Sequence, residues 1–211
     1  MYAAKSFRED RLSALHDFIV EHSFATVVSQ GPQGMQASHV PLILDRTQGP
    51  KGMLRGHFAR ANSHWQSLAD GEVLSIFHGP HAYISPSWYA SKREHGRVVP
   101  TWEYLAVHAY GAARVLDDEK ELRTLIEDLT DQHEANRPAP WKVTDAPDDY
   151  IEGAMRAIVG FELTLTRIEG IWKMSQNRPV ADRAGVVAGL REGSPMDAQV
   201  AEWIERLGEG K

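Results

Sequence analysis

The residues best suited to bind an anion lie in a short segment in the first third of the chain. Residues 54–62 have the pattern of a β-strand that runs directly into a short helical turn. Arg55, His57 and Arg60 supply cationic or hydrogen-bonding side chains there, and free N–H groups at the start of a helix favour a phosphate. The segment therefore indicates a phosphate site. The alternative is that the two arginines are surface residues and Asn62 only caps the helix.

A second candidate anion site lies near the end of the chain, in residues 172–179. Ser175 or Asn177 could cap a helix that begins near residue 179, with Lys173 and Arg178 beside the start of that helix. Cations are unfavourable at a helix N-terminus unless an anion offsets them, which favours a ligand site. The alternative is an ordinary junction between a strand and a helix.

Aromatic side chains flank the polar turns between these two segments. Trp88, Tyr89, Trp102 and Tyr104 could stack on a planar ligand or form a subunit interface. Packing in the core or at its rim is the alternative for any one of them. Four aromatic residues around polar turns nevertheless favour a ligand or an interface.

Histidine is abundant and cysteine is absent, with ten and zero residues respectively. The lack of cysteine excludes disulfides, thiolate metal sites and thiol catalysis. His78 and His81 stand three residues apart, but no ligand spacing typical of a zinc site occurs, so we expect no metal. Ser85 and Ser87 lack the context of a hydrolase nucleophile, and no catalytic residue is assigned.

Length and composition favour one large domain over the whole range 1–211. The chain has 211 residues, of which 42% are hydrophobic and 25% charged, as in ordinary globular proteins. Residues 1–115 hold nine of the histidines, with 11 basic and 9 acidic side chains, whereas residues 116–211 hold 12 basic and 20 acidic ones. No apolar run approaches the roughly 20 residues that span a bilayer, so we expect a cytoplasmic protein without a membrane partner.

Periodicity predicts strands in the first half and helices at the ends and between strands. The predicted helices cover residues 7–22, 61–68, 117–136 and 150–157, with two more at the C-terminus, and 91–97 is predicted as a loop. The predicted strands cover residues 24–29, 35–44, 53–58, 73–78, 82–85, 101–115 and 159–168. Because strands and helices do not alternate, we expect a mainly β, α+β fold, a β-barrel with helical additions, rather than a doubly wound sheet.

Several of these segments together resemble a known family, the PaiB-type FMN-binding transcriptional regulators. The resemblance covers almost the whole chain and is carried by five segments in order: residues 37–42, 54–62, 79–89, 99–102 and 172–178. It implies a split-barrel flavin-binding fold, similar to that of pyridoxamine phosphate oxidases, and a homodimer with FMN at the subunit interface.

The resemblance also implies a set of cofactor-binding residues. The phosphate would lie where the third strand meets the short helix, and strand residues near Ser38 and His39 would approach the flavin ring. Residues near the middle and the C-terminus would complete the pocket, some of them from the second subunit. The full set is Ser38, His39, Arg55, His57, Ala59, Arg60, Asn62, Ser85, Thr101, Trp102, Lys173, Gln176 and Arg178.

Three functions remain open on this sequence. The resemblance implies an FMN-binding negative transcriptional regulator, although a net charge of −6 and the lack of a recognisable helix-turn-helix weigh against strong direct DNA binding. The alternative is an FMN-dependent oxidoreductase, in which His39 or His57 could serve as an acid or base. A third interpretation is a haem-binding or haem-degrading protein with a histidine ligand. Whether the chain is an enzyme is left open.

Overall fold

The structure, a computed structural model, describes residues 1–208 and divides the chain into two compact units. Unit 1 consists of Met1–Arg11, His78–Val107 and the chain from Glu169 onward, and unit 2 consists of Leu12–Phe77 and His108–Ile168. Three long strands contribute residues to both units.

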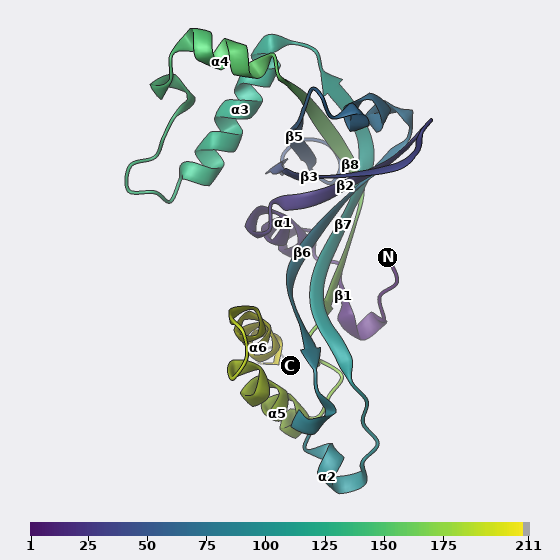
Figure 1. Ribbon diagram of the computed structural model, residues 1–211. Coiled ribbons are helices and arrows are strands. Elements are labelled where there is room, and N and C mark those ends of the chain that lie inside the picture. Colours follow the sequence, from purple (N-terminus) through teal and green to yellow (C-terminus); the bar gives the residue numbers. More distant parts are fainter. Residues whose placement is uncertain (209–211) are drawn as a thin grey trace. The chain divides into compact units, whose positions relative to one another are not determined.

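The strands form one eight-stranded antiparallel sheet (Figure 1). Its order is β3-β2-β6-β7-β8-β5-β4, and β1 pairs with the end of β8. The strands are β1 (Arg8–Glu9), β2 (Phe24–Gly31), β3 (Gly34–Pro41), β4 (Ile43–Asp45), β5 (Met53–Ala59), β6 (Glu72–Ile84), β7 (Thr101–Leu116) and β8 (Ile158–Lys173).

Helices connect and cover these strands. The α-helices are α1 (Leu12–Glu21), α2 (Ser91–His95), α3 (Glu119–Glu134), α4 (Asp148–Met155), α5 (Val180–Arg191) and α6 (Pro195–Gly208). The 3-10 helices are η1 (Lys5–Phe7), η2 (Ser63–Asp70), η3 (Pro86–Trp88) and η4 (Val143–Asp145). Among residues 1–208, every helix is too short or too polar to cross a bilayer.

The predicted first hairpin is confirmed. Strands β2 and β3 pair in register from Phe24 opposite Pro41 to Gly31 opposite Gly34, and Gly34 adopts a φ of 101° that suits glycine in the tight turn. Strand β3 is the first strand in the sheet order, so Pro41 lies in an edge strand, where its missing N–H costs least. The structure divides the predicted strand 35–44 into β3 and β4.

The predicted break at Gly79 and Pro80 is wrong, because β6 runs through both residues. The pairing of β6 with β2 ends at Phe77, opposite Ala25. Beyond that point β6 has no paired β2 residue to which a backbone N–H would donate a hydrogen bond. A proline there therefore loses no ladder bond on that side of the strand, which local sequence signals do not reveal.

The N-terminal helix is shorter than predicted. Residues 7–22 contain α1 only from Leu12, and the stretch before it forms β1, which pairs with β8 through Arg8 opposite Ile171. Glu9 does not complete a capping box. Its carboxylate instead accepts hydrogen bonds from the backbone and the guanidinium of Arg11, so the local cap signal is overridden.

In unit 2, α3 packs against the sheet at β4 and β5. Asp118 caps α3 by accepting hydrogen bonds from the N–H groups of Lys120 and Glu121. A Cβ on Gly160 of β8 would lie 2.9 to 3.1 Å from side-chain atoms of Leu122, Leu116 and Leu125, so glycine lets the helix approach closely. The core beneath α3 and α4 consists of Ile43, Leu116, Leu122, Leu125, Leu129, Val143, Ile151 and Met155.

The two predicted C-terminal helices are confirmed as α5 and α6, which pack side by side in unit 1 (Figure 1). Helix α5 also packs against η3. A Cβ on Gly185 would lie 2.0 Å from the carbonyl oxygen of Trp88, and one on Gly189 would lie 2.4 Å from the Trp88 ring. These two glycines therefore allow α5 to pack closely against Trp88. The predicted loop 91–97 contains the five-residue helix α2, which ends at Gly96 in a left-handed conformation with φ 69°.

Close approach of β7 to β8 gives a first testable prediction. A Cβ on Gly111 would lie 2.1 Å from the backbone oxygen of Thr164, which cannot move without breaking the ladder. We expect Gly111→Ala to lower the free energy of unfolding by about 3 kcal/mol or more, measured by urea denaturation. Gly71→Ala is the matched control, because no atom lies within 4 Å of the added Cβ and its φ of 179° suits any residue. Equal stability of the two variants would contradict this packing.

Candidate functional site

A hydrogen-bond network in unit 2 joins β2, β3 and η2 around His64. The His64 ring, 2% exposed, places Nδ1 2.9 Å from the Ser38 hydroxyl and Nε2 2.9 Å from the Ser29 hydroxyl. Asn62 caps η2 by accepting from the His64 N–H, and its Nδ2 donates to Ser38. Burial lowers the pKa of His64, which favours the neutral ring. The network fixes the turn at the start of η2.

Ser38 and His39 lie on opposite faces of β3. Ser38 is half-buried and belongs to the network, whereas His39 is exposed and its Nδ1 lies 3.0 Å from the Thr26 hydroxyl. Successive side chains of a strand point to opposite faces. The structure therefore brings Ser38 and Asn62 together and directs His39 elsewhere.

Arg55 and His57 share one face of β5, beneath α3. Arg55 forms an ion pair with Asp128 of α3, with 2.7 Å between Nη2 and Oδ2. His57 lies opposite Gly160 in the ladder, and burial lowers its pKa. The Arg55 Nε and His57 Nδ1 atoms are buried without a hydrogen-bond partner among the described residues.

Gly56 of β5 lies in close contact with the segment around Pro41 and Leu42. A Cβ at this position would lie 2.5 Å from Cδ2 of Leu42 and 3.1 Å from the carbonyl oxygen of Pro41. The glycine is therefore explained by packing within unit 2. Its pattern in the sequence is the same as that of a glycine facing a ligand.

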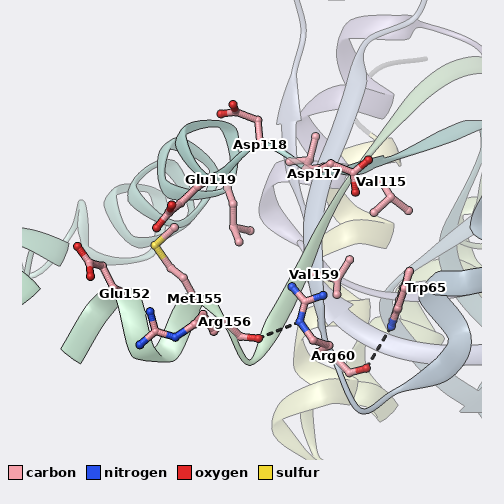
Figure 2. Close-up of a pocket in the computed structure, with 12 residues that line it drawn as sticks. Arg60, Trp65, Val115, Asp117, Asp118, Glu119, Glu152, Met155, Arg156 and Val159 are labelled. Atoms are coloured by element: carbon pink, nitrogen blue, oxygen red, sulfur yellow. Dashed lines mark hydrogen bonds between the residues drawn. The ribbon is translucent and has the colours of Figure 1, made fainter. Parts of the chain in front are cut away.

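Arg60 ties the end of β5 to the junction of α4 and β8 (Figure 2). Its Nε donates to the carbonyl of Arg156 at 2.8 Å, and its Nη2 donates to the carbonyl of Ile158 at 2.9 Å. The Trp65 indole N–H donates to the carbonyl of Arg60 itself. Ala59, which precedes Arg60, is exposed and pairs with Ile158 at the end of the ladder.

A cavity of about 350 Å³ lies beside Arg60, and carboxylates outnumber guanidinium groups among the charged residues of its lining. These charged residues are Asp117, Asp118, Glu119 and Glu152, together with Arg60 and Arg156 (Figure 2). Because like charges repel, this lining opposes a phosphate dianion. The cavity is therefore not the predicted anion site.

In unit 1, Lys173 is held at the end of β8 by residues of β7. Its Nζ donates to the Thr101 hydroxyl at 2.5 Å and to the Trp102 carbonyl at 2.6 Å. The Trp102 side chain is 55% exposed, and its ring centroid lies 5.8 Å from that of His81 and 6.3 Å from that of Tyr83. The structure thus brings Thr101, Trp102 and Lys173 together beside an exposed aromatic surface.

Gln176 and Arg178 belong to the turn that follows β8. Gln176 closes this turn by accepting from the Met174 N–H and donating to the Trp172 carbonyl. The Arg178 guanidinium lies over the Tyr89 ring, 4.6 Å from its centroid. The predicted cap by Ser175 or Asn177 is wrong, because Pro179 precedes α5 and makes no side-chain cap.

Ser85, the remaining predicted site residue, has a local role in this structure. Its hydroxyl accepts from the Ser87 N–H and caps η3. It is half-buried in unit 1. Its position therefore supports the turn before Tyr89.

Glu103 is a residue of this site that the sequence analysis did not single out. It is 2% exposed, and its Oε1 accepts a hydrogen bond from the Ser175 hydroxyl. Burial raises the pKa of Glu103 to about 7, although Ser175, Lys173 and Arg178 oppose this shift. The sequence did hold a sign that Glu103 is buried, because Glu103 and the apolar Leu105 are two positions apart and therefore lie on the same face of β7.

Comparisons with known proteins agree with a flavin site. A family model described as "Putative FMN-binding domain" matches residues 1–167. The chain is 36% identical over 210 residues to the Bacillus subtilis protein called Protease synthase and sporulation protein PAI 2, with 97% of each chain covered. It is 33% identical over 248 residues to a protein of Emericella nidulans, with 100% of this chain and 99% of that one covered.

Solved structures share the fold at low sequence identity. The flavocytochrome Anf3 from Azotobacter vinelandii matches with a TM-score of 0.57 at 10% identity, over 81% of this chain and 72% of that chain. An FAD and heme binding protein from Mycobacterium smegmatis matches with a TM-score of 0.57 at 14% identity, over 79% and 73%. At these identities the likeness shows the fold alone.

The fold and the matches define a flavin-binding protein of the split β-barrel class, which confirms the predicted fold and the predicted cofactor, FMN. The chain belongs to the PaiB-type family of FMN-binding proteins, which includes PAI 2 of Bacillus subtilis.

The residues present fit FMN by their chemistry. Its phosphate requires cations and N–H donors, which Lys173 and Arg178 supply in unit 1. Its planar ring requires an apolar or aromatic surface, which the exposed Trp102 supplies in the same unit.

The raised pKa of Glu103 gives a second prediction. A carboxyl whose pKa is higher in the folded chain than its ordinary value of 4.5 favours folding below about pH 4.5, and this contribution is lost as the pH rises to about 7. Glu103→Gln cannot ionise. We therefore expect the variant to gain stability relative to the parent between about pH 5 and about pH 8, by up to about 3 kcal/mol. Urea denaturation at each pH measures this, and parallel pH profiles would contradict it.

Proposed function

We propose that this protein is an FMN-binding regulator that works as a homodimer, with FMN at the subunit interface. The observation that carries the proposal is the pair of cations, Lys173 and Arg178, in the segment that ends β8 and leads to α5. In this proposal they hold the flavin phosphate, and the Trp102 surface contacts the ring.

The contacts of the two cations support a role in phosphate binding. An ammonium group has three N–H donors, and Lys173 uses two of them on the Thr101 hydroxyl and the Trp102 carbonyl. The Arg178 guanidinium lies over the Tyr89 ring, a contact that holds the group in place and leaves its positive charge unpaired with a carboxylate across the ring. Lys173 therefore combines a fixed position with a remaining donor, and Arg178 combines a ring contact with its full charge.

The exposed aromatic surface supports the proposed interface. Trp102 and Tyr83 are 55% and 49% exposed, respectively, and their rings contact each other edge-on. Aromatic residues are enriched at protein interfaces, and a second copy around a two-fold axis would cover this surface in both subunits at once. A flavin ring between the copies would be shielded from water by the same contact.

The regulatory part of the proposal rests on the relative PAI 2, whose name refers to protease synthesis and sporulation. A net charge of −6 does not favour a strong contact with DNA phosphates. We therefore propose that regulation acts through a protein partner or the state of the flavin rather than through tight DNA binding. FMN supplies hydride and electron transfer when bound. The alternative function is therefore that of an oxidoreductase, which differs from a regulator in that it turns over a substrate.

Replacing Lys173 tests the phosphate contact. We expect Lys173→Met to weaken FMN binding by about tenfold or more, because one charge-assisted hydrogen bond to the phosphate is lost. Riboflavin, which lacks the phosphate, should bind the parent and the variant alike. Quenching of flavin fluorescence measures both affinities. The matched control is Lys92→Met, since Lys92 is an exposed lysine of unit 1 that donates to Ser87. Equal loss for FMN and riboflavin would contradict a phosphate contact.

The oligomeric state and the function class need a separate set of measurements. We expect sedimentation of the FMN-loaded protein to give a dimer, a mobility-shift assay at moderate salt to give no stable DNA complex, and NADH or NADPH not to bleach the flavin at a catalytic rate. A loaded monomer would overturn the homodimer. Rapid bleaching with turnover would favour the oxidoreductase. A Soret band on adding hemin, abolished by changing one histidine, would favour haem binding.

A further inference from the structure

A buried carboxylic acid lies against the turn that connects the two proposed phosphate ligands. Glu103 of β7 accepts a hydrogen bond from Ser175, which stands between Lys173 and Arg178 in the chain. The second carboxyl oxygen, Oε2, is buried and has no hydrogen-bond partner among the described residues. An ionised carboxylate in this setting would leave a charged oxygen unsatisfied, whereas a protonated one would not.

The backbone at Ser175 shows how firmly this contact is held. Ser175 has a φ of 56°, a left-handed conformation that is strained for a residue other than glycine. It is also 2% exposed. Arg178 donates its backbone N–H to the Ser175 carbonyl, which closes the turn. The hydrogen bond to Glu103 thus secures a conformation that the serine would not adopt by itself.

The groups that face Glu103 are mostly cationic. Lys173 at the end of β8 and Arg178 in the turn both act on the carboxyl electrostatically. Glu103 in turn helps to raise the pKa of the nearby Tyr89 phenol, for which burial is the largest cause. An ionised Glu103 would offset part of the positive charge of the two cations. A protonated Glu103 would leave the positive charge of the two cations available to attract an anion.

We propose that Glu103 is a positioning residue for the flavin phosphate: it fixes the turn through Ser175, and its proton controls how much positive charge Lys173 and Arg178 present. The proposal rests on the proposed function, in which these two residues hold the phosphate. It adds a residue that need not touch the cofactor. It also makes the preference for FMN over riboflavin depend on pH.

The test compares FMN and riboflavin at a series of pH values from about 5 to about 9. Affinities are measured by fluorescence quenching for the parent, Glu103→Gln and the control Glu94→Gln, which changes an exposed carboxylate of α2 in the same unit. The second ionisation of the phosphate, near pH 6, strengthens FMN binding equally in all three proteins. The informative quantity is therefore the FMN-to-riboflavin preference of each variant relative to the parent.

We expect this preference in Glu103→Gln to match the parent at about pH 5.5 and to exceed it by about tenfold at about pH 8.5, the effect of one unit charge on a nearby phosphate. Glu94→Gln should follow the parent throughout. Parallel profiles for the parent and Glu103→Gln would overturn the proposal. Failure of the parent to bind FMN at any pH would instead overturn the proposed function.

Infrared difference spectra of the parent without flavin give a second measurement, and the outcome that would overturn the proposal needs the parent protein alone. We expect the carbonyl band of a protonated carboxyl to disappear as the pH rises through about 7, and to be missing from the same spectra of Glu103→Gln. A parent protein without such a band between about pH 6 and about pH 8 would overturn the proposal, because its carboxyl would already be ionised.

Discussion

The antiparallel pairing of β8 with its neighbours is the constraint on which the other features depend. Strand β8 pairs with β5 in register from Met53 opposite Thr164 to Ala59 opposite Ile158, and it accepts β1 near its other end. Close approach on β8 requires glycine at Gly160, under α3, and at Gly111 on β7. This ladder orients Arg55 and His57 toward α3, and the end of the same strand carries Lys173.

Local sequence signals predicted the elements whose determinants are themselves local. Turn chemistry located the hairpin of β2 and β3, and helical periodicity with an acidic first turn located α3. The continuity of β6 through Pro80 was not predictable, because it depends on where the partner β2 ends. The start of α1 was missed for a similar reason, since pairing with β8 keeps Arg8 and Glu9 extended.

In the candidate site, too, the sequence shows which residue types are present but not which partners they contact. The sequence singled out the cations as candidate anion ligands, but it could not reveal that Arg55 pairs with Asp128, 73 positions away. Nor could it reveal the buried Ser29–His64–Ser38 contacts, since hydroxyls and a histidine on three elements have no pattern of their own. Glu103 differs from these cases, because an acidic residue that alternates with apolar residues along one face of a strand can be recognised from the sequence alone.

The kind of partner decides which of the predicted cations can still attract an anion. Arg55 faces a carboxylate, so its charge is largely offset before any ligand arrives. Arg60 and Lys173 donate to neutral carbonyl and hydroxyl oxygens, which fix their positions without cancelling their charge. Arg178 lies over a neutral ring. Of these residues, Lys173 and Arg178 act on Glu103, a carboxyl whose raised pKa of about 7 lets its charge change near neutral pH. In the proposed anion site of unit 1, the strength of anion binding would therefore depend on whether that proton is present.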